Sequence, residues 1–204
     1  FGAGWNEVDG ADQMSGLTSE AIFLAKLVTV LIPEDAEAWG LLSLMLHAEA
    51  RREARRKDGR YVPLMEQDVE CWRHDLISMA EHALTQASRL HQPGRFQLEA
   101  AIQSAHAAAR LYGHEVRNDV VALYEALLDL APSTGAETGY AAALSNAGRD
   151  TDALLALERM DTGRIASYQP YWAVRAHVLK RLGDERAGES YDRAIGLSTD
   201  DAAR

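Results

Sequence analysis

Apolar residues recur every three or four positions along most of this 204-residue chain, which is the spacing of one face of an α-helix. Helix-terminating residues divide the pattern at five places: Pro33, Gly113, Pro132, Gly148 and Gly183. The resulting segments predict helices over about 18–31, 34–57, 66–90, 95–112, 116–131, 136–147, 150–160, 168–182 and 184–197. Short turns between such helices produce antiparallel hairpins, so the pattern predicts an all-α fold.

The first predicted helix carries apolar residues that we expect to face the protein interior. They are Ala21, Leu24, Ala25, Leu27, Val28 and Leu31. Residues 1–17 contain four glycines and several turn formers, so we expect a lead-in or linker there. We also expect a short tail over 198–204.

The second half of the chain contains a repeat. Residues 124–130 (YEALLDL) align with residues 191–197 (YDRAIGL), 67 positions later, which is close to twice the tetratricopeptide period of about 34 residues. The turn glycines Gly148 and Gly183 lie 35 positions apart, in agreement with that period. We therefore predict a bundle of long helices over 18–115 and tetratricopeptide-like hairpins over 116–197. A plain helical bundle is the alternative for the second part.

The composition strengthens the helical prediction and excludes several functions. Alanine and leucine, which favour helices, number 35 and 25, whereas the β-branched valine and isoleucine number 10 and 6. The net charge of −10 argues against a segment that holds nucleic acid through a basic surface, so we expect no direct DNA binding. The single cysteine, Cys71, excludes an internal disulfide and is typical of the reducing cytoplasm. No apolar run is long enough for a bilayer and no signal peptide is visible, so we expect no membrane contact.

The sequence contains no recognisable catalytic constellation. His74 and His82 are eight residues apart, as are His106 and His114, and this spacing differs from that of paired metal ligands on a helix. Glycine-rich phosphate loops, GxSxG and HExxH motifs are absent. We interpret Cys71 as a small packing residue and the histidines as partly buried structural residues. The prediction is a protein without enzymatic activity, metal or cofactor.

One strongly basic stretch, Arg51–Lys57, has five cations in seven residues and suits phosphate or an acidic protein surface. Together with the beginning of the next predicted helix, it supplies the candidate partner-contact residues. These are Arg51, Arg52, Arg55, Arg56, Gln67, Asp68 and Trp72. The alternative for the basic stretch is a solvated helix end whose cations pair with nearby carboxylates.

Several segments, taken in order, resemble a known family. They are Glu20–Ile22, Gly40–His47 with Ala50 and Arg51, Glu66–Asp68 with Trp72, Phe96–Ile102 with His106 and Ala107, Leu123–Leu128 with Ala131–Ser133, and Arg181–Gly183. In this order they resemble the C-terminal extension of a subgroup of extracytoplasmic-function RNA polymerase sigma factors. The resemblance covers the chain from about Thr18 to Leu197. It departs from the family at Phe1–Trp5, where the family has a Phe-Asn-Glu-Gly-Tyr-like motif, and again after Ser133.

The resemblance implies a helical regulatory region that contacts its own sigma domains or the RNA polymerase core in the cytoplasm. Nothing in the chain resembles a promoter-reading helix-turn-helix, and the chain begins with Phe1 rather than Met, so we expect the sigma domains to lie upstream. Two other functions stay open. One is a free-standing tetratricopeptide-like scaffold that binds a peptide or protein. The other is a helical enzyme or small-molecule sensor, which a polar, convergent pocket would favour.

Overall fold

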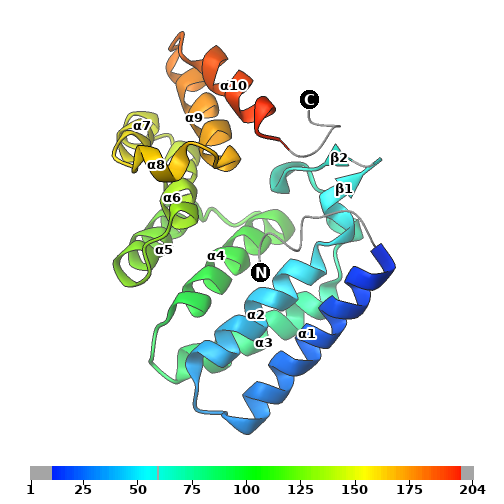
Figure 1. Ribbon diagram of the computed structural model, residues 1–204. Coiled ribbons are helices and arrows are strands. Elements are labelled where there is room, and N and C mark those ends of the chain that lie inside the picture. Colours follow the sequence, from blue (N-terminus) through cyan, green and yellow to red (C-terminus); the bar gives the residue numbers. More distant parts are fainter. Residues whose placement is uncertain (1–10, 59, 199–204) are drawn as a thin grey trace. The chain divides into compact units, whose positions relative to one another are not determined.

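The computed structural model describes residues 11–58 and 60–198 (Figure 1). Within these residues it has ten α-helices, three short 3-10 turns and one two-stranded sheet, which confirms the predicted all-α fold of helical hairpins. The described residues form two compact units, one over 11–57 and 62–111 and the other over 58, 60–61 and 112–198. The first ten residues of the predicted lead-in and nearly all of the predicted tail lie outside the described residues.

The first unit is built around a central helix. Its elements are α1 (Ala11–Leu31), α2 (Ala36–Ala50), η1 (Glu53–Arg55), β1 (Arg56–Lys57), η2 (Leu64–Glu66), η3 (Val69–Cys71), α3 (His74–Arg89) and α4 (Arg95–Tyr112). The strand β2 (Arg60–Tyr61), which forms the two-stranded sheet with β1, falls in the stretch 58–61 that is grouped with the second unit. Helix α2 packs against both α1 and α3 (Figure 1). Its Leu42, Met45 and Leu46 are buried in one core with Trp72 and Ile77. Because α2 has neighbours on more than one side, it buries residues around much of its circumference.

The beginning of α2 and its approach to α4 follow from local chemistry. Asp35 caps α2, and its Oδ1 accepts hydrogen bonds from the backbone N–H groups of Glu37 and Ala38 at 2.8 and 3.0 Å. One turn later, a Cβ atom placed on Gly40 would lie 2.5 Å from the backbone nitrogen of Gln97 in α4. Only glycine allows this approach, so α2 and α4 touch backbone to backbone.

Helix α1 differs from the prediction in its start and in its inward face. It begins at Ala11, so the predicted lead-in over 1–17 is wrong from that residue onward. Its buried residues are Ile22, Ala25 and Thr29. The predicted inward residues Leu24, Leu27, Val28 and Leu31 are exposed instead. The physical reason is that α1 packs on α2 through one narrow side, so only that side is covered.

The predicted second and third helices are both shorter than expected. Helix α2 ends at Ala50 because the Ala50 carbonyl accepts the N–H of Arg73, so the basic stretch is not a helix end but η1 followed by β1. The predicted helix over 66–90 begins only at His74. Before it, Asp68 accepts the N–H of Glu70 at 3.0 Å and closes the separate turn η3. Such side-chain bonds compete with a continuous helix.

The second unit follows the predicted helix boundaries closely. Its helices are α5 (Arg117–Leu130), α6 (Thr134–Asn146), α7 (Asp150–Glu158), α8 (Thr162–Ile165), α9 (Gln169–Leu182) and α10 (Ala187–Gly196). The one-turn helix α8 was not predicted. Gly148 and Gly183 have φ values of 79° and 71°, the left-handed conformation that ends a helix without strain at glycine. Neighbours in sequence pack together as hairpins, with α6 and α7 both contacting α9.

Candidate functional site

A polar stripe runs along the buried side of α2. Ser43, His47 and Arg51 are spaced four residues apart, and only 0%, 1% and 8% of each residue is exposed. Residues at this spacing share one side of a helix. Burying polar groups costs free energy unless they find partners, so the contacts of this stripe decide what it does. We call Ser43, His47, Arg51 and the polar groups that contact them the buried polar seam.

Arg51 joins three parts of the first unit. Its Nη2 donates a hydrogen bond to Oε1 of Gln103 on α4, and its Nε donates to the carbonyl oxygen of His47 at 3.4 Å. Its guanidinium carbon lies 5.8 Å from the centroid of the Trp72 ring, within cation–π range. The charged group therefore fastens the end of α2 to α4 and to the residue that precedes α3.

The charge of Arg51 acts on His106, which is half-buried on α4. Burial of the imidazole, and to a smaller extent the positive charge of Arg51, lower the pKa of His106 to about 4. Both effects oppose the protonated ring. His106 is therefore neutral at pH 7 and adds no second positive charge to the seam.

His47 and Glu81 form the end of the seam that reaches solvent. His47 Nε2 lies 3.3 Å from Oε1 of Glu81, whose side chain is 45% exposed, and the hydroxyl of Ser104 donates to Oε2 of Glu81 at 2.9 Å. The contact with His47, followed by that with Ser104, holds the pKa of Glu81 below its ordinary value although burial raises it. Ser104 donates to the carboxylate and not to His47, so the three side chains do not have the Ser–His–acid order of a catalytic triad.

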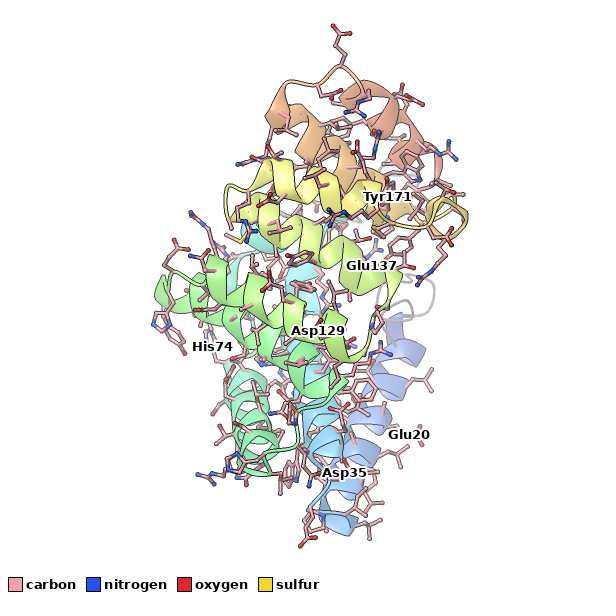
Figure 2. The ribbon with its side chains drawn as sticks, turned by 90° about the vertical axis from the view of Figure 1, so that its left-hand side faces the viewer. Glu20, Asp35, His74, Asp129, Glu137 and Tyr171 are labelled. Carbon is pink, nitrogen blue, oxygen red and sulfur yellow. The ribbon has the colours of Figure 1, made fainter. Side chains whose placement is uncertain are left out.

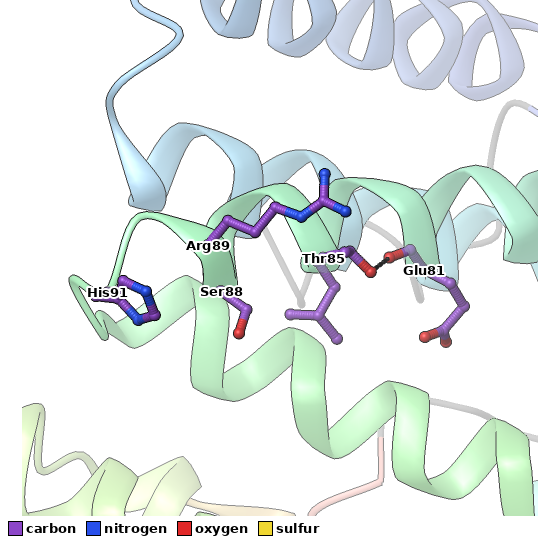
Figure 3. Close-up of a pocket in the computed structure, with 6 residues that line it drawn as sticks. Glu81, Thr85, Ser88, Arg89 and His91 are labelled. Atoms are coloured by element: carbon purple, nitrogen blue, oxygen red, sulfur yellow. Dashed lines mark hydrogen bonds between the residues drawn. The ribbon is translucent and has the colours of Figure 1, made fainter.

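An open groove of about 350 Å³ lies on the outer side of Glu81 (Figure 3). Its lining comes from α3 and the turn after it: Glu81, Leu84, Thr85, Ser88, Arg89 and His91. Figure 3 shows the Thr85 hydroxyl bonded to the Glu81 carbonyl oxygen, a contact of 2.8 Å within α3. The groove is thus a shallow surface beside one helix. Its polar groups do not converge on one point.

Gln67 secures the connection between β2 and α3. Its Nε2 donates to the carbonyl of Val62 at 3.1 Å, and its own carbonyl accepts from Nη2 of Arg110 on α4 at 2.8 Å. Several side-chain atoms of this unit are buried without a hydrogen-bond partner among the described residues, including Ser43 Oγ, Gln67 Oε1, Trp72 Nε1 and Arg110 Nε. The seam therefore retains hydrogen-bonding capacity that the described protein groups do not use.

The structure divides the seven predicted contact residues into two sets. Arg51, Gln67 and Trp72 are buried, with exposed fractions of 8%, 2% and 3%, so their observed role is internal fastening and they are not available to a partner. The other four reach the surface: Arg52, Arg55, Arg56 and Asp68. Contact with a partner stays a prediction for these four.

The sequence analysis did not single out Glu81, Gln103 and Ser104 of the buried polar seam, nor Arg110, which bonds the Gln67 carbonyl. It expected His106 to be a partly buried structural residue, and the structure agrees. A signal was present, because Gln103, His106 and Arg110 are spaced three and four residues apart within an alanine-rich helix and so share one side. Cys71, interpreted as a packing residue, is exposed, so that interpretation was wrong.

The second unit carries a separate aromatic site around Trp172 on α9. The indole Nε1 donates to the carbonyl of Ile165 at 3.0 Å, and the Tyr171 ring meets the indole edge-on, with centroids 5.1 Å apart. The guanidinium carbons of Arg193 and Arg175 lie 4.4 and 5.8 Å from the Trp172 ring centroid. Two cations on one aromatic ring form a surface suited to an anionic partner.

Among the residues that the structure describes, there is no group of three or more His, Cys, Asp or Glu side chains placed to hold a metal ion. Likewise, no helix between residues 11 and 198 is both long and apolar enough to cross a membrane.

Comparison with known proteins gives two similarities. Residues 1–88 match a family of unknown function (DUF6596). An uncharacterized protein of Rhizobium meliloti (strain 1021) is 33% identical over 202 residues, which cover 98% of this chain and 48% of that protein. The chain therefore spans about half the length of this curated relative. No solved structure matches.

Proposed function

We propose that this chain is the regulatory C-terminal region of a bacterial sigma factor and that it works in the cytoplasm by protein contact, without catalysis. The observation that carries the proposal is that segments resembling the sigma-factor extension meet in space. Gly40 of one segment lies against the backbone of Gln97 of another. Arg51, which follows the first of these segments, acts on His106, which follows the second. The resembling residues are thus partners in one packing arrangement, which supports a shared fold.

The length of the Rhizobium relative also supports the proposal. Nearly the whole of this chain aligns with only 48% of that protein, so more than half of the relative lies outside the alignment. That remainder has room for the domains that a sigma factor needs to bind polymerase and promoter. A basic helix-turn-helix in it would agree with the proposal.

The mechanism we propose is a shift in the population of the arrangements that the sigma domains adopt. A helical region that binds the sigma domains in one arrangement favours that arrangement by its differential affinity. The four surface residues Arg52, Arg55, Arg56 and Asp68 are the candidate contacts. Because this part of the surface is locally basic while the chain carries a net charge of −10, it suits an acidic patch on the partner.

The test is transcription with purified components. We expect core RNA polymerase with the full-length Rhizobium relative to initiate at a cognate promoter, and deletion of the region matched by this chain to reduce or abolish that initiation. A second arm measures retention of core polymerase on the 204-residue chain, with Arg52→Ala/Arg56→Ala against the control Arg159→Ala/Arg164→Ala in the second unit. Unchanged transcription after the deletion, or no promoter-dependent transcription with the full-length protein, would refute the proposal.

The Trp172 site favours a second candidate function, a helical scaffold that binds an acidic peptide. Arg193 is exposed and lies 4.4 Å from the indole ring, so a carboxylate can reach the guanidinium without unfolding the unit. A fluorescein-labelled peptide rich in glutamate and leucine serves as the probe. Fluorescence anisotropy should show binding that Arg193→Ala weakens and the exposed control Arg164→Ala does not. Equal binding by both variants would exclude this site.

A further inference from the structure

Helix α1 exposes a continuous apolar face. Between Phe23 and Leu31, six large apolar side chains have exposed fractions between 42% and 74%. They are Phe23, Leu24, Leu27, Val28, Val30 and Leu31. One turn and more before them, Leu17 is 62% exposed. Together they leave on the order of 700 Å² of apolar surface on one helix, more than the roughly 300–600 Å² of the largest patch on a typical monomer.

The apolar residues of this face have the spacing of a helix–helix interface. Leu17, Leu24 and Leu31 follow one another at intervals of seven residues, and Leu27 lies three residues after Leu24. These are the a and d positions of a heptad, which pack one helix against another. Phe23 and Val28 flank this row of leucines on its two sides, so the apolar face of α1 is wider than a narrow leucine stripe.

We propose that α1 pairs with the α1 helix of a second copy of this chain, in antiparallel orientation about a two-fold axis near Ala25. An interface of ordinary size buries about 800 Å² on each partner, and the exposed face of α1 supplies most of this area. A two-fold interface uses the same patch on both copies, which a single apolar helix face satisfies. The proposal is independent of any role in transcription.

The antiparallel orientation of the two α1 helices follows from Glu20, the charged residue within the row of apolar residues on α1. Glu20 is exposed and projects from α1 away from the other helices (Figure 2). In a parallel pair, the two Glu20 carboxylates would face each other across the interface, which is unfavourable. In the antiparallel pair, Glu20 lies beside Leu31 of the other copy. The two carboxylates are then separated by about 16 Å along the axis.

The charge of the whole chain gives the pairing a distinctive salt dependence. Each copy carries a formal charge of −10, so the copies repel each other at low ionic strength. Added salt screens this repulsion but leaves the apolar contact in place. The dimer should therefore become tighter as salt concentration rises, opposite to an interface held by ion pairs.

Sedimentation equilibrium of the full 204-residue chain tests the association. We expect a dimer at micromolar concentration, and we expect Leu24→Glu/Leu27→Glu to weaken it by about 100-fold or more, because the pair would bury four carboxylates. The matched control is Leu130→Glu/Leu155→Glu in the second unit, where the side chains are 50% and 47% exposed, similar to the tested pair. Circular dichroism of each variant separates loss of pairing from loss of fold.

Disulfide trapping tests the orientation. In a Cys71→Ser background, which removes the exposed native thiol, Glu20→Cys/Leu31→Cys should form covalent dimers under mild oxidation, whereas Glu20→Cys alone should not. Efficient crosslinking by Glu20→Cys alone would indicate a parallel pair and overturn the proposed arrangement. A monomer at all concentrations would overturn the pairing itself. So would a monomer that binds neutral phosphatidylcholine vesicles, which would assign the face to a lipid surface.

Discussion

The carboxylate of Glu37, in the first turn of α2, accepts a hydrogen bond from the backbone N–H of Phe96 at the N-terminus of α4, at 3.0 Å. Its other oxygen accepts from the N–H of Gln97 at 3.1 Å. A side chain 59 residues away in sequence thus caps α4 and satisfies two N–H groups that have no partner within their own helix. The negative charge also lies at the positive end of the α4 dipole. One carboxylate therefore fixes the relative position of two helices.

Removing this cap should destabilise the protein. We expect Glu37→Ala to lower the free energy of unfolding by about 2 kcal/mol, because two N–H groups lose their acceptor, and Glu37→Gln to lower it by about 1 kcal/mol, because the amide keeps one acceptor oxygen. Urea denaturation measures both. Glu34→Ala, an exposed carboxylate three residues earlier, is the control and should change stability by less than about 0.5 kcal/mol. Equal effects of Glu34→Ala and Glu37→Ala would contradict the capping role.

The close approach of α2 and α4 predicts that Gly40 tolerates no side chain. The added methyl group of Gly40→Ala would lie 2.5 Å from the Gln97 nitrogen, and backbone cannot move aside as a flexible side chain can. We expect a loss of about 2–3 kcal/mol in thermal or urea unfolding. Gly188→Ala is the matched control, because it also lies in a helix but has no neighbouring atom within 4 Å of the added carbon. That variant should gain about 0.5–1 kcal/mol from helix propensity alone.

The lowered pKa of His106 predicts a specific loss of stability in mild acid. The unfolded chain binds a proton at His106 near the ordinary pKa of 6.5, whereas the folded protein binds it only near 4. Between these values the unfolded state holds more protons, so stability falls as the pH is lowered, by about 3 kcal/mol in total. His106→Gln should remove this part of the slope. Glu81, whose pKa is also lowered, loses its contribution further into acid and does so in both proteins.

The control for this titration is His74→Gln, which replaces an exposed histidine at the start of α3. Unfolding free energies of the three proteins are measured in urea between pH 7 and pH 4. The His74 variant should follow the parent protein throughout. If the His106 variant follows it as well, His106 does not titrate as the structure indicates.

Replacing Arg51 and replacing its neighbour Arg52 should have different effects on stability, because Arg51 is buried and Arg52 lies near the surface. Arg51→Ala should cost about 2–3 kcal/mol of stability, because a buried arginine loses its hydrogen bond to Gln103 and its packing on Trp72. Arg52 makes a 3.4 Å ion pair with Glu49 near the surface, and its replacement by alanine should cost less than about 1 kcal/mol. Thermal unfolding measures both. Near-equal losses would show that burial does not distinguish the two residues.

Local signals in the sequence located the helices of the second unit. Pro132 and the glycines Gly148 and Gly183 interrupt the apolar pattern where the helices end, because proline lacks a donor and glycine alone adopts the left-handed turn without strain. These causes act within a few residues, so the sequence displays them directly. Where the competing bonds come from side chains, as at Asp68, the predicted helix began too early.

The buried polar seam was only partly predictable. Arg51, Gln67 and Trp72 were singled out from the sequence, but as contacts for a partner. The burial of Arg51 and Gln67 depends on α4, whose Gln103 and Arg110 lie 52 and 43 positions from them in sequence and supply hydrogen bonds to the Arg51 side chain and the Gln67 carbonyl. The sequence does not show which distant residue accepts a hydrogen bond from an arginine, so an arginine in a basic stretch is expected to be solvated even where the fold buries it.

Helix propensity and turn geometry depend on neighbouring residues, so the amino-acid pattern was enough to establish that the chain is helical and where most helices end. Which side of each helix faces inward depends instead on the helices that pack against it. Helix α1 is apolar around most of its circumference, and its contact with α2 covers Ile22, Ala25 and Thr29 while leaving Leu24 and Leu27 exposed. The charge of Arg51 is buried in the same way by other elements, through its contacts with Gln103 on α4 and with Trp72. Burial depends on both helices that pack together, and the hydrophobic pattern of one helix does not specify the surface of its partner.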